Sequence, residues 1–166
     1  MVASWLGWTG KVDAVWLLPS FSHPFAKDLA PFEHRVAMCE AVAEVVGAEV
    51  CTIESTLPTP SYTIDVLRAL AAKHPRDRFQ LVAGADVLEE LPRWKSWPEI
   101  AADFTPIIVG RQGYACPPGA IEFPPVSSTQ IRKSLAAGEG VEHLVPEVVR
   151  PFLDFYRPSG PKPMNA

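Results

Sequence analysis

The sequence has no excess of positive charge, no long apolar run and no leader-like start, and each absence excludes a class of protein. Lysine and arginine total 15 against 19 aspartates and glutamates, which gives a net charge of −4. Without a broad basic surface, the chain is not expected to bind nucleic acid, so any phosphate chemistry must depend on a local site. The apolar stretches are too short for a membrane span, and the first residues lack the basic start and apolar core of a signal peptide.

Cysteine and histidine are few and show no pairing or metal-binding pattern. The three cysteines, Cys39, Cys51 and Cys116, form no Cys-x-x-Cys pair, and their odd number and wide spacing are typical of a cytoplasmic protein with reduced thiols. The histidines also lack metal-ligand spacing, so we expect each to be structural or solvated and expect no protein-bound metal. They are His23, His34, His74 and His143.

What the chain does contain is enough apolar sequence for one core. It has 166 residues, of which 48% are hydrophobic and 20% charged, as in a globular domain. No internal repeat or second domain is evident. We predict a single domain over residues 1–157 and a disordered tail over residues 158–166, where prolines cluster.

Predicted strands alternate with predicted helices along the chain. Apolar and β-branched runs predict strands at residues 12–18, 50–53, 79–83, 106–109 and 121–123. Helical spacing and start signals predict helices at residues 1–9, 31–46 and 61–74, short ones ending at Leu91 and starting at Pro98, and a last one at 146–156. This alternation predicts an open parallel α/β sheet with flanking helices.

The segment from Pro125 to Leu135 has the pattern of a helix start that is rich in anion-binding groups. Ser127, Ser128 and Thr129 are all good N-cap residues. The start of a helix has free backbone N–H groups and a partial positive charge, which suit a phosphate. Arg132 follows one turn later, where its guanidinium is placed for a bidentate phosphate contact. The alternative for this segment alone is a capped surface helix with a solvated arginine.

Three groups of polar residues follow predicted strands. They are Ser20 to Lys27, Gly84 to Asp86, and Ser127 to Arg132. Open parallel sheets bind ligands at the carboxyl ends of their strands, near the point where the strand order switches. The shared placement therefore favours a common binding site over three separate structural explanations.

Four stretches of the chain together carry a resemblance to a known family. They are Leu18-Pro19 with a His/Pro/Lys loop behind it, Ser61-Tyr62-Thr63-Ile64-Asp65, Gly84-Ala85-Asp86 followed by Leu91-Pro92-Arg93-Trp94 and Trp97, and Val126-Ser127-Ser128-Thr129-Gln130-Ile131-Arg132. In this order they resemble bacterial nicotinate-nucleotide adenylyltransferases, a branch of the nucleotidylyltransferase superfamily, over nearly the whole chain up to Arg157. The last stretch is a strong superfamily signal. The Ser-Tyr-Thr and Gly-Ala-Asp stretches with Trp94 favour this branch over pantetheine-phosphate or cytidylyl relatives.

The resemblance implies a Rossmann-like open parallel sheet and an enzyme of NAD biosynthesis. It implies transfer of AMP from ATP, accompanied by Mg²⁺, to nicotinate mononucleotide, which yields deamido-NAD and pyrophosphate. Arg132 and Lys27 match phosphate-binding positions at the reacting centre. The residues that match ATP-binding positions are Gly84, Asp86, Ser128, Thr129 and Arg132. Gly84 and Asp86 would contact the ribose, and the others the phosphates.

The resemblance also implies a site for the second substrate. Trp94 would stack on the pyridine ring, and Tyr62 and Thr63 would hold the nicotinate carboxylate through backbone groups. Without the family resemblance, Trp94 is better explained as a core residue, because tryptophans are mostly buried. Likewise Asp86 is a natural helix cap, Tyr62 and Thr63 are plain first-turn residues, and Lys27 is a solvated lysine.

Two departures from the family pattern are present. The phosphate loop of the family reads Pro-Pro-His-Lys, whereas this chain has Ser22-His23-Pro24-Phe25-Ala26-Lys27, which leaves the roles of His23 and Lys27 open. The family also begins with a strand, a glycine-rich turn and an H-x-G-H motif whose histidines stabilise the reacting phosphates, and none of these occurs here. Either the chain starts at an internal methionine or the lineage has lost the motif, and the abrupt helical start without a cap favours the first.

These departures lead to a structural prediction and two alternative functions. The strand that is missing is central in the family, so we predict a sheet that lacks it, with a gap, a swapped segment or a homo-oligomer at that place. The alternatives to catalysis are a nucleotide-binding protein without turnover and an interaction protein that keeps only the fold. The sequence does not decide between nicotinate and nicotinamide mononucleotide.

Overall fold

The computed structural model describes residues 1–22 and 29–157, so Lys27 and the predicted tail lie outside the described residues. The α-helices are α1 (Val2–Trp8), α2 (Phe32–Val46), α3 (Thr63–Lys73), α4 (Trp97–Asp103) and α5 (Ser128–Ala136). The strands are β1 (Trp16–Leu17), β2 (Glu49–Val50), β3 (Val82–Gly84), β4 (Ile107–Arg111) and β5 (Glu122–Phe123). The 3₁₀ helices are η1 (Ile53–Thr56), η2 (Ala85–Val87), η3 (Leu91–Arg93) and η4 (Glu147–Tyr156).

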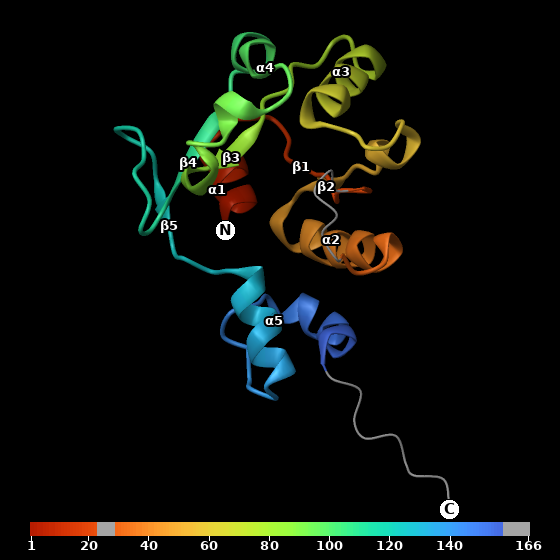
Figure 1. Cartoon of the computed structure of the whole chain (residues 1–166), viewed down its shortest axis with the longest axis vertical. Helices are drawn as coiled ribbons and strands as arrows, with labels where there is room; N and C mark the ends of the chain where they lie inside the picture. Colours follow the sequence, from red (N-terminus) through yellow and green to blue (C-terminus); the bar gives the residue numbers. More distant parts are fainter. Residues whose placement is uncertain (23–28, 158–166) are drawn as a thin grey trace, which may run out of the picture.

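Every strand pair is parallel, as predicted, but the strands form two separate sheets. β1 pairs with β2, and β4 lies between β3 and β5. Within residues 1–22 and 29–157 no strand joins β1 to β3, so each of these strands has one edge without a partner (Figure 1). The result confirms the prediction of a Rossmann-like parallel sheet that lacks its first strand.

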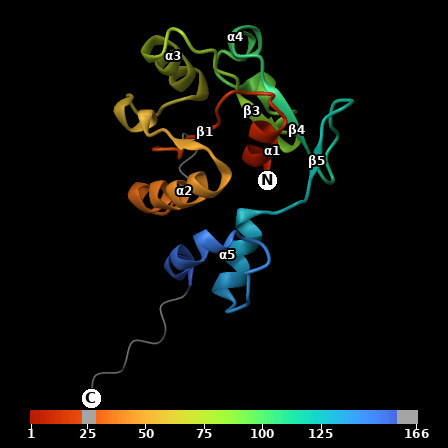
Figure 2. The same cartoon turned by 180° about the vertical axis from the view of Figure 1, so that it is seen from behind.

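The helices bury their apolar faces in two clusters. Ile64 and Leu67 of α3 pack with Ile100 and Phe104 around the start of the three-stranded sheet. A second cluster joins α5 to η4 and consists of Leu135, Val141 and Leu153. Because α5 packs on η4, and η4 in turn contacts α2, the last part of the chain lies beneath both sheets in Figures 1 and 2.

Helix α1 packs on the three-stranded sheet with its first residues toward α5. The Trp5 ring meets Phe123 of β5 edge-on, with ring centroids 6.0 Å apart, and Leu6 is only 1% exposed. In both views the N-terminus lies at the end of β3 to β5 that faces α5 (Figures 1 and 2). The start of the described chain therefore lies next to the carboxyl ends of the strands.

The boundaries of several predicted elements are wrong for identifiable reasons. Helix α3 begins at Thr63, two residues later than predicted, with Tyr62 as its N-cap. The buried Ser61 hydroxyl donates to Glu54 instead, and Asp65 accepts from the Tyr62 backbone N–H at 3.2 Å. The short helix predicted to end at Leu91 is replaced by η2 and η3. The last helix, predicted at residues 146–156, spans Glu147–Tyr156 and is a 3₁₀ helix, with Pro151 inside it removing a backbone donor.

The described residues contain no helix that is both long and apolar enough to cross a membrane.

The cysteines are free and differ in accessibility, which gives a test of the packing of α2. Cys116 is exposed, whereas burial raises the pKa of the Cys39 thiol, with the Arg35 charge opposing the rise. A raised pKa leaves less thiolate at mildly alkaline pH, so iodoacetamide should label Cys116 at least about fivefold faster than Cys39. Mass spectrometry after timed quenching measures both rates, and the rates should converge in urea. Equal rates in the folded protein would show that α2 is not packed as described.

Candidate functional site

Gly84 and Asp86 lie where predicted, at the carboxyl end of β3. Gly84 is the last residue of the strand and the N-cap of η2, and no side chain caps that helix, so Asp86 is not a capping residue. A Cβ added at Gly84 would overlap Asp86 Oδ1, so only glycine allows the carboxylate to lie against the end of the strand. This carboxylate is 25% exposed and remains accessible to a ligand.

Arg111 holds this carboxylate from the end of the neighbouring strand. It is the last residue of β4, and its Nη1 donates to Asp86 Oδ2. Its Nη2 donates to the carbonyl oxygen of Val126 at 3.0 Å, one residue before Ser127, the N-cap of α5. One guanidinium thus links the Gly84–Asp86 stretch to the start of the predicted phosphate-binding helix.

A cavity of about 380 Å³ opens at this end of the three-stranded sheet. Its walls come from the carboxyl ends of β3, β4 and β5, from the segment after β5, and from Met1 and Val2 at the start of α1. Gly84, Asp86 and Arg111 all line it. The cavity therefore lies where open parallel sheets bind their ligands.

Helix α5 is capped by Ser127, one of the three candidate N-cap residues, and presents its polar residues to solvent. Ser127 Oγ accepts from the Gln130 backbone N–H at 3.5 Å, while Ser128, Thr129 and Arg132 are exposed. Burial raises the pKa of the Tyr156 hydroxyl, and the charge of Arg132 opposes that rise, as does that of Arg35.

The segment that carries Lys27 is anchored at both of its described ends. Arg35 Nε donates to the Ala30 carbonyl oxygen at 2.9 Å, and Arg35 Nη1 donates to the Ser20 carbonyl oxygen. Ser20 Oγ in addition donates to Glu54 Oε1 at 3.1 Å. The position predicted for Lys27 itself lies outside the described residues.

The residues predicted to bind the second substrate gather at the start of α3. Lys95, next to Trp94 in the chain, lies 4.6 Å from the centre of the Tyr62 ring. The Lys95 ammonium also donates to both carboxylate oxygens of Asp65, at 3.1 and 3.0 Å. Because Thr63 is the first residue of α3, these contacts bring the helix start and the Trp94 segment together.

Trp94 is partly buried and packs against the core cluster of α3 and α4. Trp94 is therefore a core residue, as expected from its residue type alone. Partial burial also leaves part of the indole accessible, so packing does not exclude a stacking role. Trp97 packs against the same cluster.

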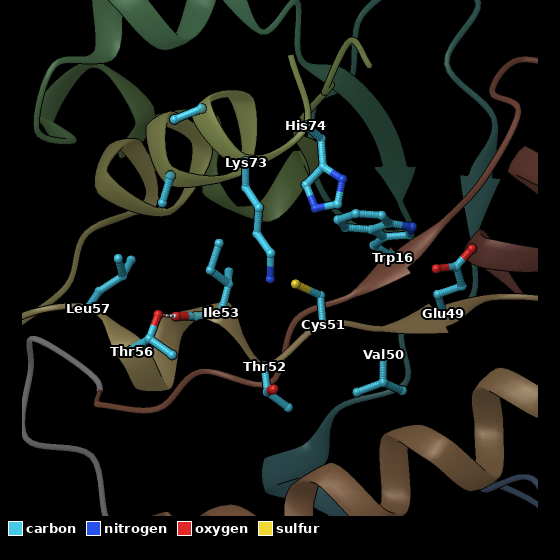
Figure 3. Close-up of a pocket in the computed structure, with 12 residues that line it drawn as sticks. Trp16, Glu49, Val50, Cys51, Thr52, Ile53, Thr56, Leu57, Lys73 and His74 are labelled. Carbon is cyan, nitrogen blue, oxygen red and sulfur yellow. Dashed lines mark hydrogen bonds between the residues drawn. The ribbon is translucent and has the colours of Figure 1, made fainter. Parts of the chain in front are cut away.

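A larger cavity, of about 690 Å³, lies at the other sheet and contains none of the predicted site residues. It is formed by β2, η1 and the end of α3. Figure 3 shows the Lys73 ammonium pointing toward the Cys51 sulfur. His74 meets Trp16 edge-on, at 5.1 Å between ring centroids, and closes one side (Figure 3). The smaller cavity is the better candidate because it combines the strand ends with a carboxylate and a guanidinium.

Sequence reasoning missed three residues that hold the site together. Arg111, Glu54 and Lys95 each contact a residue that is distant in sequence, and none belongs to a recognisable motif. Arg111 alone had a usable signal, because it lies two residues after the predicted strand at residues 106–109. No group of three or more His, Cys, Asp or Glu side chains suitable for a metal ion occurs in the described part of the chain.

Comparisons with known proteins agree with this geometry. The sequence model of the family described as cytidylyltransferase-like matches residues 8–134. The chain is 48% identical over 158 residues to a probable nicotinate-nucleotide adenylyltransferase of Anaeromyxobacter sp. (strain K). The alignment covers 93% of this chain and 84% of the relative. It is 42% identical over 152 residues to one of Myxococcus xanthus (strain DK1622), covering 88% of this chain and 78% of the relative.

The fold matches a solved structure as well. Plasmodium falciparum nicotinic acid mononucleotide adenylyltransferase, complexed with NaAD, superposes with a TM-score of 0.78 over 94% of this chain and 87% of that one, at 17% identity. The parallel strands and the match of residues 8–134 to the cytidylyltransferase-like family together identify the chain as a nucleotidyltransferase. Within that class, the chain belongs to the nicotinate-nucleotide adenylyltransferase family. The family predicted from the four sequence stretches is confirmed.

Proposed function

We propose that this protein transfers AMP from ATP to nicotinate mononucleotide, releasing pyrophosphate and forming deamido-NAD. The observation that carries the proposal is the cavity at the strand ends. There Arg111 joins Asp86 to the segment that begins α5. The Asp86 carboxylate can accept from ribose hydroxyls, and the nearby start of α5 can bind phosphates. Together they suit a nucleoside triphosphate, because its ribose and phosphates are covalently linked. Family membership supports the choice of nucleotide and acceptor.

The reaction requires positioning and charge stabilisation more than covalent catalysis. A phosphate oxygen of nicotinate mononucleotide attacks the α-phosphorus of ATP, and the bond from that phosphorus to the pyrophosphate oxygen breaks. Asp86 accepts from the ribose hydroxyls, while Arg132 and the N–H groups of Ser128 and Thr129 bind the leaving phosphates. Lys27 is proposed to contact phosphate as well. Mg²⁺ enters bound to the ATP phosphates as part of the substrate.

The test is pyrophosphate release by the 166-residue chain with Mg²⁺, ATP and nicotinate mononucleotide. Parallel assays replace ATP with CTP, and nicotinate mononucleotide with the nicotinamide form. Release that depends on ATP and on the nicotinate form supports the proposal. Release with CTP, or with no preference for a pyridine mononucleotide, contradicts it.

A second candidate is nucleotide binding without turnover. Its support is the absence of H-x-G-H from the 166 residues, since those histidines act at the reacting phosphates in the family. Calorimetry distinguishes the two functions, because ATP binding without detectable pyrophosphate release favours this candidate. The cytoplasmic location inferred from the cysteines and the homo-oligomer inferred from the unpaired edges of β1 and β3 stay predictions.

Replacing Trp94 by alanine should weaken binding of nicotinate mononucleotide about tenfold and change ATP binding little, because stacking is lost on one ligand only. Calorimetry with each ligand measures both affinities. Trp97→Ala is the matched control, since Trp97 packs against the same core cluster and any general loss of stability should be similar. If both variants weaken both ligands equally, Trp94 is only a core residue.

A further inference from the structure

The carboxyl end of β4 is paired with a strand on each side. β4 is the central strand of its sheet, with Gly84 in register with Val109 and Arg111 with Phe123. A Cβ at Gly110 would lie 2.9 Å from the Ile121 carbonyl oxygen, so β4 and β5 approach too closely there for a side chain. The backbone of Arg111 is therefore fixed by pairing and close packing, and its side chain extends from a rigid base.

We propose that Arg111 is a positioning residue that orients Asp86 toward the nucleotide ribose and fixes its distance from the start of α5. The inference rests on the proposed function, because it assumes that Asp86 accepts from the ribose hydroxyls. The guanidinium binds Asp86 Oδ2 through Nη1 and the Val126 carbonyl oxygen through Nη2. A planar guanidinium makes both bonds from one rigid fork, which a lysine ammonium does not reproduce.

The two bonds have different consequences for a bound nucleotide. The bond to Oδ2 fixes the rotation of the carboxylate and leaves Oδ1, which has no donor among the described residues, for a ribose hydroxyl. The bond to Val126 holds the residue before the α5 cap at a set distance from that carboxylate. Since ribose and triphosphate belong to one molecule, both subsites must keep a fixed spacing to bind it together.

The simpler explanation is a structural ion pair that adds stability and nothing else. The Arg111 and Asp86 side chains are 30% and 25% exposed, so water screens their attraction and its contribution to folding is small. The pair also lines the cavity instead of lying on an outer face. Arg68 and Glu99, which join α3 to α4 and line neither cavity, provide a pair of the same type for comparison.

The experiment compares ATP with 2′,3′-dideoxy-ATP, which lacks the ribose hydroxyls, by calorimetry on the full chain. The wild type should prefer ATP. In Arg111→Met the ratio of the two affinities should fall at least about tenfold, mainly through weaker ATP binding, because a misoriented carboxylate loses its hydroxyl bonds. Arg111→Lys should lower the ratio by an intermediate factor. Asp86→Ala added to Arg111→Met should lower it no further, since both act through one contact.

Arg68→Met is the control and should leave the ratio unchanged, because it removes an arginine–carboxylate pair away from the cavity. An unchanged ratio in Arg111→Met, even with weaker binding of both nucleotides, overturns the inference while the proposed function stands. Should Arg111→Met fail to fold, as judged by circular dichroism, an unchanged ratio in Arg111→Lys overturns it equally. A wild-type chain that binds neither nucleotide overturns the proposed function and the inference together.

Discussion

Joining a segment with a β-strand, a glycine-rich turn and H-x-G-H to Met1 is expected to raise pyrophosphate release at least about 100-fold. The 166 residues contain no such motif, and its histidines stabilise the reacting phosphates in the family that the chain resembles. Removing one preorganised group that stabilises the transition state commonly costs on the order of 100- to 1000-fold in rate. Without the segment, the chain should bind nucleotide through Asp86 and α5 but turn it over slowly.

The structure gives this segment a place in the fold. Among the described residues β1 and β3 each have one unpaired edge, and both strands belong to parallel sheets, so a strand between them would join the two sheets. Met1 and Val2 line the cavity that contains Asp86 and Arg111. A turn that ends at Met1 therefore places its histidines beside the proposed ribose and phosphate positions.

The control is the same segment with both histidines replaced by alanine. This version should pair with β1 and β3 and raise the melting temperature as much as the first, because backbone hydrogen bonds do not depend on the side chains. It should not raise the rate. Equal rates for the two versions would assign the gain to the strand alone. Full activity in the original 166 residues would show that the histidines are dispensable, and the proposed mechanism would be wrong.

The alternation of strands and helices was predictable because it depends on local hydrophobic patterns. Strand lengths were not, because a strand ends where its partner ends. Residues 12–18 form an apolar run interrupted only by Asp13, yet only Trp16 and Leu17 pair, since β2 offers only Glu49 and Val50. The sequence shows which residues can be buried in a sheet, while the partner strand decides which of them form the ladder.

The site residues that belong to sequence motifs were predictable. The contacts between site residues that are distant in sequence were not. Gly84, Asp86 and the α5 start were all placed at strand ends by the sequence. The contact between Arg111 and Asp86 spans 25 residues and depends on the register of β3 with β4. A single sequence contains no record of that register, so the residue linking two predicted subsites was the one missed.

Replacing Arg132 by alanine is expected to weaken ATP binding by about 100-fold and leave AMP binding nearly unchanged. A guanidinium that makes two charge-assisted hydrogen bonds to a phosphate is not replaced by water. AMP lacks the β- and γ-phosphates, so the loss should appear only with the triphosphate. Arg132 is exposed on α5, one turn after the Ser127 cap, and is free to reach a ligand at the helix start.

Lys133→Ala is the matched control for charge. Lys133 is also exposed and belongs to the same turn of α5, so its replacement removes one positive charge from nearly the same place. Arg132→Lys keeps the charge but loses the bidentate geometry, and should weaken ATP binding about tenfold. Calorimetry with ATP and with AMP on all three variants measures these differences. If Lys133→Ala weakens ATP as much as Arg132→Ala does, the helix attracts phosphate through net charge, and Arg132 has no specific role.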